Sequence, residues 1–288
     1  MTIEIVKAPP FATVQDMGWP VGRAIGLPEG GAMDRAALAA ANRAVGNAET
    51  AAGIEIALGA GTFRFAEAAV VAVAGLAEVR LGGELVPHTL MVPAAVPITL
   101  YPRPERRFVY LAVRGGIAVP ELLGSRSTYL PAGFGGYEGR RLRNGDSLPI
   151  GAAPPGSAPE PERGPEEEAT GPLKLRAARG PQWDRFGKSA QAAFFAAEFR
   201  VAPASDRMGY RLLGPSLAPE ELAALPSEAA CPGAIQVPDG GQPIVLMPDG
   251  PTVGGYPKIA VLLRPEVGRL AQCPPGAAVR FVEVGTLL

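Results

Sequence analysis

Short runs of branched and aromatic residues recur along the chain, separated by glycine and proline turns. Such runs are too short for helices and are typical of buried strands. The runs expected as strands are residues 54–58, 62–65, 70–74, 79–81, 89–92, 108–113, 173–177, 244–247, 259–263 and 279–284. The last of them, VRFVEV, alternates apolar and polar residues as a half-buried strand does. This spacing predicts a turn-rich, mainly β protein with barrels or sandwiches.

Three segments are expected as short helices. Residues 34–45 place alanines, Leu38 and Val45 on one side and end at Gly46 and Asn47, which suit a helix C-terminus. The other two are residues 188–199 and residues 219–225, the latter with a proline in its first turn. The fold class predicted is therefore mainly β with a few short helices.

A change of composition divides the chain. Residues 152–172 are rich in Pro, Gly and Glu and contain almost nothing to bury, so we interpret them as a linker. A chain of 288 residues is also long enough for two domains. We expect an N-terminal domain over residues 1–151 and a C-terminal domain over residues 173–288.

Composition and charge exclude several classes of partner. The net charge of −1 gives no field to hold a nucleic acid or an anionic membrane. The longest apolar run, residues 68–77, is too short to cross a bilayer, and the N-terminus has no signal-like apolar core. We therefore expect a cytoplasmic protein. Cys231 and Cys273 form no C-x-x-C pattern, so neither a zinc site nor a disulfide framework is indicated.

The segment of residues 242–265 carries the densest concentration of chemistry. It places a long Gly/Pro connection between two apolar runs, and its glycines allow backbone N–H groups to approach a ligand. The polar and small residues of this connection are Asp249, Thr252, Gly254, Gly255, Tyr256 and Lys258. A hairpin needs only two loop residues, so we interpret the connection as a site loop for an anion or an amide. The alternative is an irregular surface loop whose charges are solvated.

Two further groups of charged residues are candidates. In the run SDRMGYR, Asp206 and Arg207 either pair to fix a turn or take part in catalysis beside Tyr210. Arg126 either binds a carboxylate through two hydrogen bonds or fastens a loop. Its neighbours in this hypothesis are Arg114, Ser125 and Ser127. Residues 13–34 form a run of turn residues that ends at Asp34, which is also expected on irregular backbone.

Several common active sites are missing from the sequence. His88 is the only histidine and no G-x-S-x-G turn is present, which argues against a Ser-His-Asp triad. Gln182 stands where a phosphate-binding loop ending in Gly187, Lys188 and Ser189 would need its first glycine. No cluster has metal-ligand spacing. The remaining chemistry is acid–base catalysis by carboxylates, lysine and tyrosine, with arginines and backbone amides as anion receptors.

Eight motifs spread over almost the whole chain carry a family resemblance. They are TVQDMG, GGAMD, LAVRGG, GSRST, GGYEGR, SDRMGYRL, PGAIQVP and DGPTVGGYPKIAVL. Together they resemble the KipA-like family, also called allophanate hydrolase subunit 2 or the C subunit of 5-oxoprolinase (PxpC). The resemblance implies two cyclophilin-like β-barrel domains. The first loop departs from the family pattern, because Gly18 to Arg23 read GWPVGR where relatives often carry GRPGYR.

The resemblance also implies a function and partners. It implies the C subunit of an ATP-dependent 5-oxoprolinase, a hydrolase that opens the lactam of 5-oxo-L-proline to L-glutamate together with two further subunits, one KipI-like and one LamB/YcsF-like. ATP would be shared with or bound by these partners, and the chain alone would be inactive. One alternative is a biotin-dependent carboxyltransferase component acting on urea or a similar small amide, with biotin on another protein. A further alternative is a non-catalytic antagonist of a KipI-like kinase inhibitor.

These considerations select the residues expected at the site. The catalytic candidates are Lys258, Asp249, Tyr256 and Asp206. The substrate-binding candidates are Arg207, Tyr210, Arg126, Ser127, Arg114, Thr252, Gly254, Gly255 and Asp34. No metal site is expected.

Overall fold

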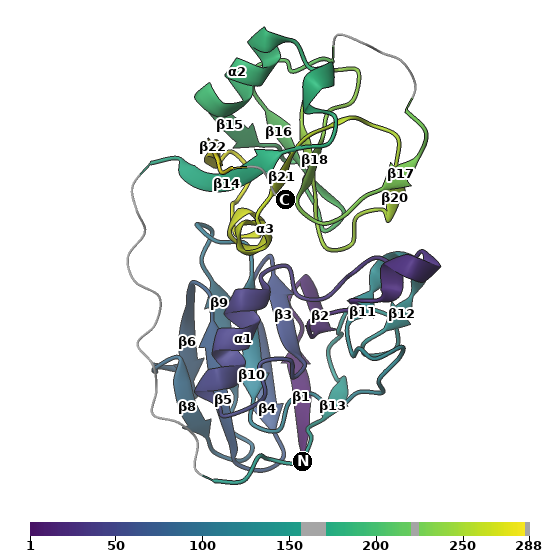
Figure 1. Ribbon diagram of the computed structural model, residues 1–288. Helices are drawn as coiled ribbons and strands as arrows, with labels where there is room; N and C mark the ends of the chain where they lie inside the picture. The colour runs from purple at the N-terminus through teal and green to yellow at the C-terminus, as the bar shows by residue number, and fades with distance from the viewer. Residues whose placement is uncertain (157–170, 220–224, 286–288) are drawn as a thin grey trace. The chain divides into compact units, whose positions relative to one another are not determined.

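The structure is a computed structural model that describes residues 1–156, 171–219 and 225–285 (Figure 1). The chain divides into two units. The first unit comprises Met1–Pro20 and Gly30–Glu167, and the second comprises Val21–Glu29 and Glu168–Leu288. The second unit thus includes a short N-terminal segment that a linear division of the chain does not assign to it.

The first unit is built from two antiparallel sheets. The six-stranded sheet has the order β13-β1-β4-β9-β6-β7, from β1 (Thr2–Lys7), β4 (Gly61–Phe65), β6 (Ala77–Leu81), β7 (Glu84–Leu85), β9 (Ile98–Pro102) and β13 (Ser147–Pro149). The five-stranded sheet has the order β2-β3-β10-β5-β8, from β2 (Phe11–Gln15), β3 (Gly53–Ala57), β5 (Ala69–Ala74), β8 (Thr89–Val92) and β10 (Val109–Val113). A small hairpin pairs β11 (Thr128–Tyr129) with β12 (Phe134–Gly135), joined by the 3₁₀ turn Leu130–Ala132.

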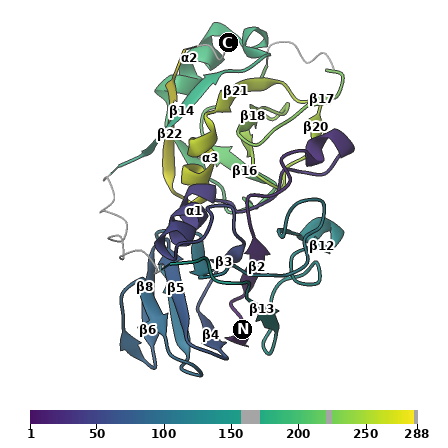
Figure 2. The ribbon, with the colours of Figure 1, turned by 60° about the horizontal axis from the view of Figure 1, so that its bottom comes forward.

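One core lies between these two sheets. Alternate residues of both sheets supply it, for example Ile5 and Phe63 from one and Ile54 and Leu111 from the other. The opposite face of the five-stranded sheet is covered by helix α1 (Arg35–Ala44), whose alanines pack on β5 and β10 (Figures 1 and 2). Since β10 is covered on both faces, all five of its residues are buried.

The second unit contains a closed seven-stranded barrel. Its order is β14-β21-β18-β19-β16-β15-β22, from β14 (Leu173–Arg179), β15 (Phe199–Val201), β16 (Gly209–Leu213), β18 (Ala234–Gln236), β19 (Ile244–Leu246), β21 (Lys258–Leu262) and β22 (Ala278–Glu283). Its other elements are α2 (Lys188–Ala196), α3 (Arg264–Ala271), the two-stranded sheet of β17 (Glu228–Ala229) and β20 (Val253–Gly254), and the 3₁₀ turns Gly22–Ile25 and Trp183–Arg185. Phe194 of α2 stacks on Phe281 of β22 with ring centroids 4.5 Å apart, which fixes α2 on the barrel.

The mainly β prediction is confirmed, and all ten predicted strand runs coincide with strands whose ends differ by a few residues. The helix expected at 34–45 is α1, whereas α2 ends three residues before 199. Helix α3 was not predicted, and Phe11–Gln15 is a strand although the residues from 13 onward were expected to be irregular. Most of the expected linker and of the helix at 219–225 lies outside the described residues, so the predicted domain boundaries stay predictions.

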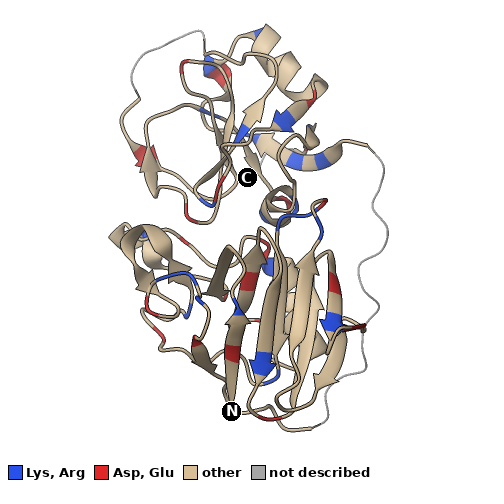
Figure 3. Cartoon of the chain, turned by 180° about the vertical axis from the view of Figure 1, so that it is seen from behind, with Lys and Arg blue, Asp and Glu red and all other residues tan. Residues whose placement is uncertain are grey.

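Charge is interspersed over both units, with acidic and basic side chains on strands and loops alike (Figure 3). Among the residues that the structure describes, no helix is both long and apolar enough to cross a membrane.

Candidate functional site

Lys258 stands at the first position of β21, and only 4% of its surface is exposed. Its ammonium Nζ donates to Glu228 Oε1 at 2.5 Å. Glu228 belongs to β17, and 41% of its side chain is exposed. The lysine expected in a site loop is therefore a buried cation at the start of a strand, and its counter-ion is partly exposed to solvent.

Gln182 connects the two charged residues. Its Nε2 donates to Glu228 Oε1 at 2.6 Å, and its Oε1 accepts a hydrogen bond from the backbone N–H of Lys258 at 3.0 Å. We call Gln182, Glu228 and Lys258 the lysine cluster. The hydrogen bond from Lys258 lowers the pKa of the Glu228 carboxyl from its ordinary value of 4.5, so this carboxylate is ionised at neutral pH.

The predicted site loop is held beside this cluster by the β17–β20 sheet. Glu228 pairs in register with Gly254, and the carbonyl of Thr252 accepts a hydrogen bond from Ala230 N–H at 2.9 Å. Tyr256 is 49% exposed, so its phenol is presented to solvent. Of the predicted residues, the structure therefore brings Thr252, Gly254 and Lys258 together through Glu228 and its strand.

Gln236 is a further polar residue at this place. It is the cross-strand partner of Lys258, at a point where the register of the β18–β21 pair shifts. Gln236 is 5% exposed, and its side-chain amide forms no hydrogen bond to any described residue, with Nε2 fully buried. A Cβ atom at Gly254 would lie 2.7 Å from that nitrogen.

The sequence reasoning missed Gln182, Glu228 and Gln236 as site residues. No local pattern marks them, because Gln182 and Glu228 lie 76 and 30 residues from Lys258 in sequence. Only the alternation in the run PGAIQVP, which places a polar Gln236 among apolar neighbours, could have drawn attention to one of them.

Arg207 and Asp249 form a separate buried pair. Arg207 Nε and NH2 donate to the two carboxylate oxygens of Asp249 at 2.7 and 2.9 Å, and Asp249 N–H donates to the Arg207 carbonyl at 2.9 Å. The Asp249 carboxylate is thus committed to Arg207, and Lys258 has Glu228 as its counter-ion. This bidentate pair fastens the loop before β16 to the loop after β19.

The neighbours of Arg207 have structural contacts as well. Asp206 is exposed, and its Oδ1 accepts hydrogen bonds from Met208 N–H at 2.8 Å and Gly209 N–H at 3.2 Å. It closes a turn, as the alternative interpretation expected, but Arg207 pairs with Asp249 instead of Asp206. Tyr210 is fully buried and donates its hydroxyl to the Ala271 carbonyl at 2.7 Å, so its phenol belongs to the barrel core.

In the first unit, the buried carboxylate of Asp16 holds the loop that carries Arg126 and Ser127. Its Oδ1 accepts from Ser125 Oγ at 2.5 Å, Ser127 Oγ at 2.6 Å and Gly18 N–H at 2.8 Å, and its Oδ2 accepts from Arg126 N–H at 2.6 Å. We call these residues the Asp16 anchor. Ser127 is buried, and its hydrogen bond to Asp16 holds the loop in place. The Arg126 guanidinium binds Glu121 at 3.0 Å.

Arg114 and Asp34 also make local structural contacts. Arg114 donates to the carbonyls of Val45, Pro154 and Gly156 at 2.8, 2.8 and 2.6 Å. Asp34 is the N-cap of α1, and its Oδ1 accepts from Ala37 N–H at 3.1 Å. Its own N–H donates to the Tyr110 hydroxyl at 2.7 Å.

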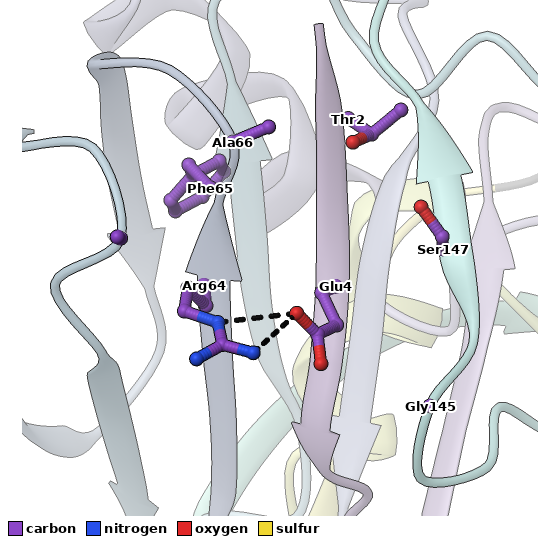
Figure 4. A pocket seen from close by; sticks show the side chains of 8 residues that line it. Thr2, Glu4, Arg64, Phe65, Ala66, Gly145 and Ser147 are labelled. Atoms are coloured by element: carbon purple, nitrogen blue, oxygen red, sulfur yellow. Dashed lines mark hydrogen bonds and ion pairs between the residues drawn. The ribbon is translucent and has the colours of Figure 1, made fainter.

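A hollow on the six-stranded sheet contains none of the predicted residues (Figure 4). Glu4 and Arg64 extend across it, with Arg64 Nε and NH2 donating to Glu4 Oε2 at 3.1 and 2.7 Å. These are the only charged side chains among its lining residues, and they neutralise each other. We therefore place the candidate site at the lysine cluster. The described residues contain no group of His, Cys, Asp or Glu that could hold a metal.

The comparisons with known proteins agree on one family. Residues 25–283 match the family model described as carboxyltransferase domain, subdomain A and B. The chain is 40% identical over 285 residues to a protein of Escherichia coli named as the C subunit of 5-oxoprolinase, covering 98% of this chain and 91% of that protein. A protein of the same name in Haemophilus influenzae is 36% identical, with the same two coverages. The crystal structure of the K. lactis urea amidolyase superposes with a TM-score of 0.91 at 29% identity, over 98% of this chain and 19% of that one.

Proposed function

Because this chain belongs to the carboxyltransferase-domain family of subdomains A and B, we propose that it is the C subunit of an ATP-dependent 5-oxoprolinase, a hydrolase that opens 5-oxo-L-proline to L-glutamate. The observation that carries this proposal is the 40% identity to the C subunit of a 5-oxoprolinase over almost the full length of both chains. Such a role implies other subunits, and we propose that one is KipI-like and another is LamB/YcsF-like.

The lysine cluster supplies the chemistry that lactam opening needs. When water attacks an amide carbon, negative charge develops on the amide oxygen, and a preorganised cation in a dry site stabilises that charge strongly. Lys258 is such a cation, since it is buried and held by Glu228 and Gln182. Glu228 orients the ammonium and, with 41% of its side chain exposed, remains accessible to a ligand from solvent.

The described residues do not fit a complete nucleotide site. The buried cations Lys258 and Arg207 belong to separate ion pairs, with Glu228 and with Asp249. A triphosphate would need several unpaired donors in one cradle. We therefore place ATP on the partner subunits, route no step of this chain through it, and expect the isolated chain to be inactive.

We propose that the protein works in the cytoplasm. Cys231 and Cys273 are free thiols in the structure, which agrees with a reducing compartment.

The test is reconstitution from purified subunits. We expect 5-oxoproline-dependent ATP hydrolysis and glutamate release when all three subunits are mixed, and loss of both when this chain is omitted. Full turnover without this chain, or 5-oxoproline-stimulated ATPase from this chain by itself, contradicts the proposal.

A second candidate function rests on the likeness to the K. lactis urea amidolyase at a TM-score of 0.91. In that case the chain would transfer a carboxyl group from a biotinyl partner to urea or a similar small amide. One experiment distinguishes the two functions. A biotinylated carrier should stimulate activity only if the second function is correct, and 5-oxoproline should stimulate activity only if the first is correct.

A further inference from the structure

Gln236 presents an unsatisfied carboxamide inside the barrel unit. A buried amide without a partner loses free energy relative to one in water, so native proteins leave few such groups. The buried Nε2 of this carboxamide has no hydrogen bond to any described residue, although Gln236 is the cross-strand partner of Lys258. A ligand that offers the matching groups would restore the lost hydrogen bonds.

Gly254 keeps the space beside this carboxamide free of a side chain. A Cβ atom there would lie 2.7 Å from Gln236 Nε2, closer than such contacts occur. The φ angle of Gly254 is not in the left-handed region, so backbone conformation alone does not require glycine. A side chain at residue 254 would therefore displace the Gln236 amide.

The shape of a primary carboxamide defines what it can recognise. It presents a carbonyl oxygen and an N–H on the same side, and rotation by 180° exchanges them. A five-membered lactam is necessarily a cis amide, so its own N–H and C=O also lie on one side. Two parallel hydrogen bonds can then form, one in each direction. A trans peptide amide, the usual form in proteins, cannot make this pair.

We propose that Gln236 binds the N–C=O edge of a lactam substrate through two parallel hydrogen bonds, with Lys258 beside it as the cation for the lactam oxygen. This proposal rests on the proposed function, because it identifies the part of 5-oxo-L-proline that the site binds.

The test measures ligand binding to the full chain by calorimetry and the KM for 5-oxoproline in the reconstituted complex. Gln236→Met keeps the length of the side chain and removes both hydrogen bonds. Gly254→Ala places a methyl group against Gln236 Nε2 and pushes the amide aside. The matched controls are Gln242→Met, which removes a carboxamide that bonds the backbone of Gly214, and Gly240→Ala, whose Cβ would meet nothing within 4 Å.

Each lost neutral hydrogen bond weakens binding roughly two- to tenfold, so we expect Gln236→Met to weaken 5-oxoproline binding by about 5- to 100-fold and to raise KM by a similar factor. Gly254→Ala should do the same, while both controls bind as the wild type does. 2-Pyrrolidone, a lactam without a carboxylate, should show the same ratio between wild type and Gln236→Met. Proline, which has no lactam, should show no difference.

Unchanged 5-oxoproline binding and KM in both Gln236→Met and Gly254→Ala overturn the inference even if the complex is fully active. A different outcome separates this inference from the proposed function. If the wild-type complex does not turn over 5-oxoproline but lactam binding still depends on Gln236, the proposed function fails and the recognition of lactams stands.

Discussion

At the scale of single residues, burial decides which charges can take part in chemistry. Lys258 and Arg207 are both buried, but Asp249 binds Arg207 through both oxygens, whereas Glu228 binds Lys258 through one and is 41% exposed. The first pair fastens two loops. The second pair has a partly exposed carboxylate, which makes Lys258 the residue to test.

Replacing Lys258 by methionine keeps the buried stem and removes the charge. We expect a loss of about 100-fold or more in the kcat of the reconstituted complex, because a preorganised charged donor is lost. Tyr256→Phe removes one neutral hydrogen bond at most, so about two- to tenfold is expected. Steady-state kinetics measure both, and Lys174→Met, on an exposed lysine, is the control. Undiminished activity of Lys258→Met would show that the cluster is structural.

The lysine cluster also predicts a pH dependence. Lys258 lowers the pKa of Glu228, so the ion pair adds stability above the ordinary carboxyl pKa of 4.5 and loses it as pH falls through the lowered value. Below about pH 5, the free energy of unfolding should therefore fall less steeply with decreasing pH in Glu228→Gln than in the wild type. Equilibrium urea unfolding between about pH 3 and 7 measures it, and identical pH profiles for the two proteins contradict the assignment.

At the scale of elements, polar side chains at strand ends decide how loops are held. Asp16 lies directly after β2, and its carboxylate accepts four hydrogen bonds. Three of them come from residues 125–127, which precede β11. The cap of α1 by Asp34 is a single hydrogen bond at 3.1 Å. Both residues lie in the same unit, so their contributions can be compared directly.

We expect Asp16→Ala to lower the free energy of unfolding by about 2–4 kcal/mol, because it leaves several buried donors unsatisfied. Asp34→Ala should lower it by about 0.5–2 kcal/mol, the usual effect of losing an N-cap. Chemical denaturation gives both values. A larger effect for Asp34→Ala than for Asp16→Ala would mean that the loop of residues 125–127 is held by something else.

At the scale of the whole molecule, the chain has two units with cores of their own. The core of the first unit lies between its sheets, and the second unit closes seven strands into a barrel. A change buried in one unit should therefore act on that unit first. The Arg207–Asp249 pair offers the sharpest test, since both side chains are at least nine-tenths buried.

Asp249→Ala leaves the Arg207 charge buried without its carboxylate, which typically costs about 3–5 kcal/mol. We expect amide hydrogen exchange to increase in the barrel strands β16 and β19, where the two loops are fastened. The strands of the first unit should keep their protection. Equal loss of protection in both units would show that the chain unfolds as one cooperative body.

The sequence by itself determined ten of the strands, the helix α1 and the family. Each of these depends on information within a short window: the alternation of apolar residues, the caps and turn residues, and motifs in a fixed order. The same local information identified the loop from Asp249 to Lys258, because a long connection dense in glycine and charge stands out without any knowledge of the fold.

Only the tertiary structure decided what each polar residue binds. Lys258 meets Glu228 across 30 residues, Arg207 meets Asp249 across 42, and Asp16 meets Ser127 across 111. Strand order and register set these encounters, and a residue's neighbours in sequence do not encode them. For the same reason the sequence could not show that Lys258 pairs with a partly exposed carboxylate and Arg207 with a buried one.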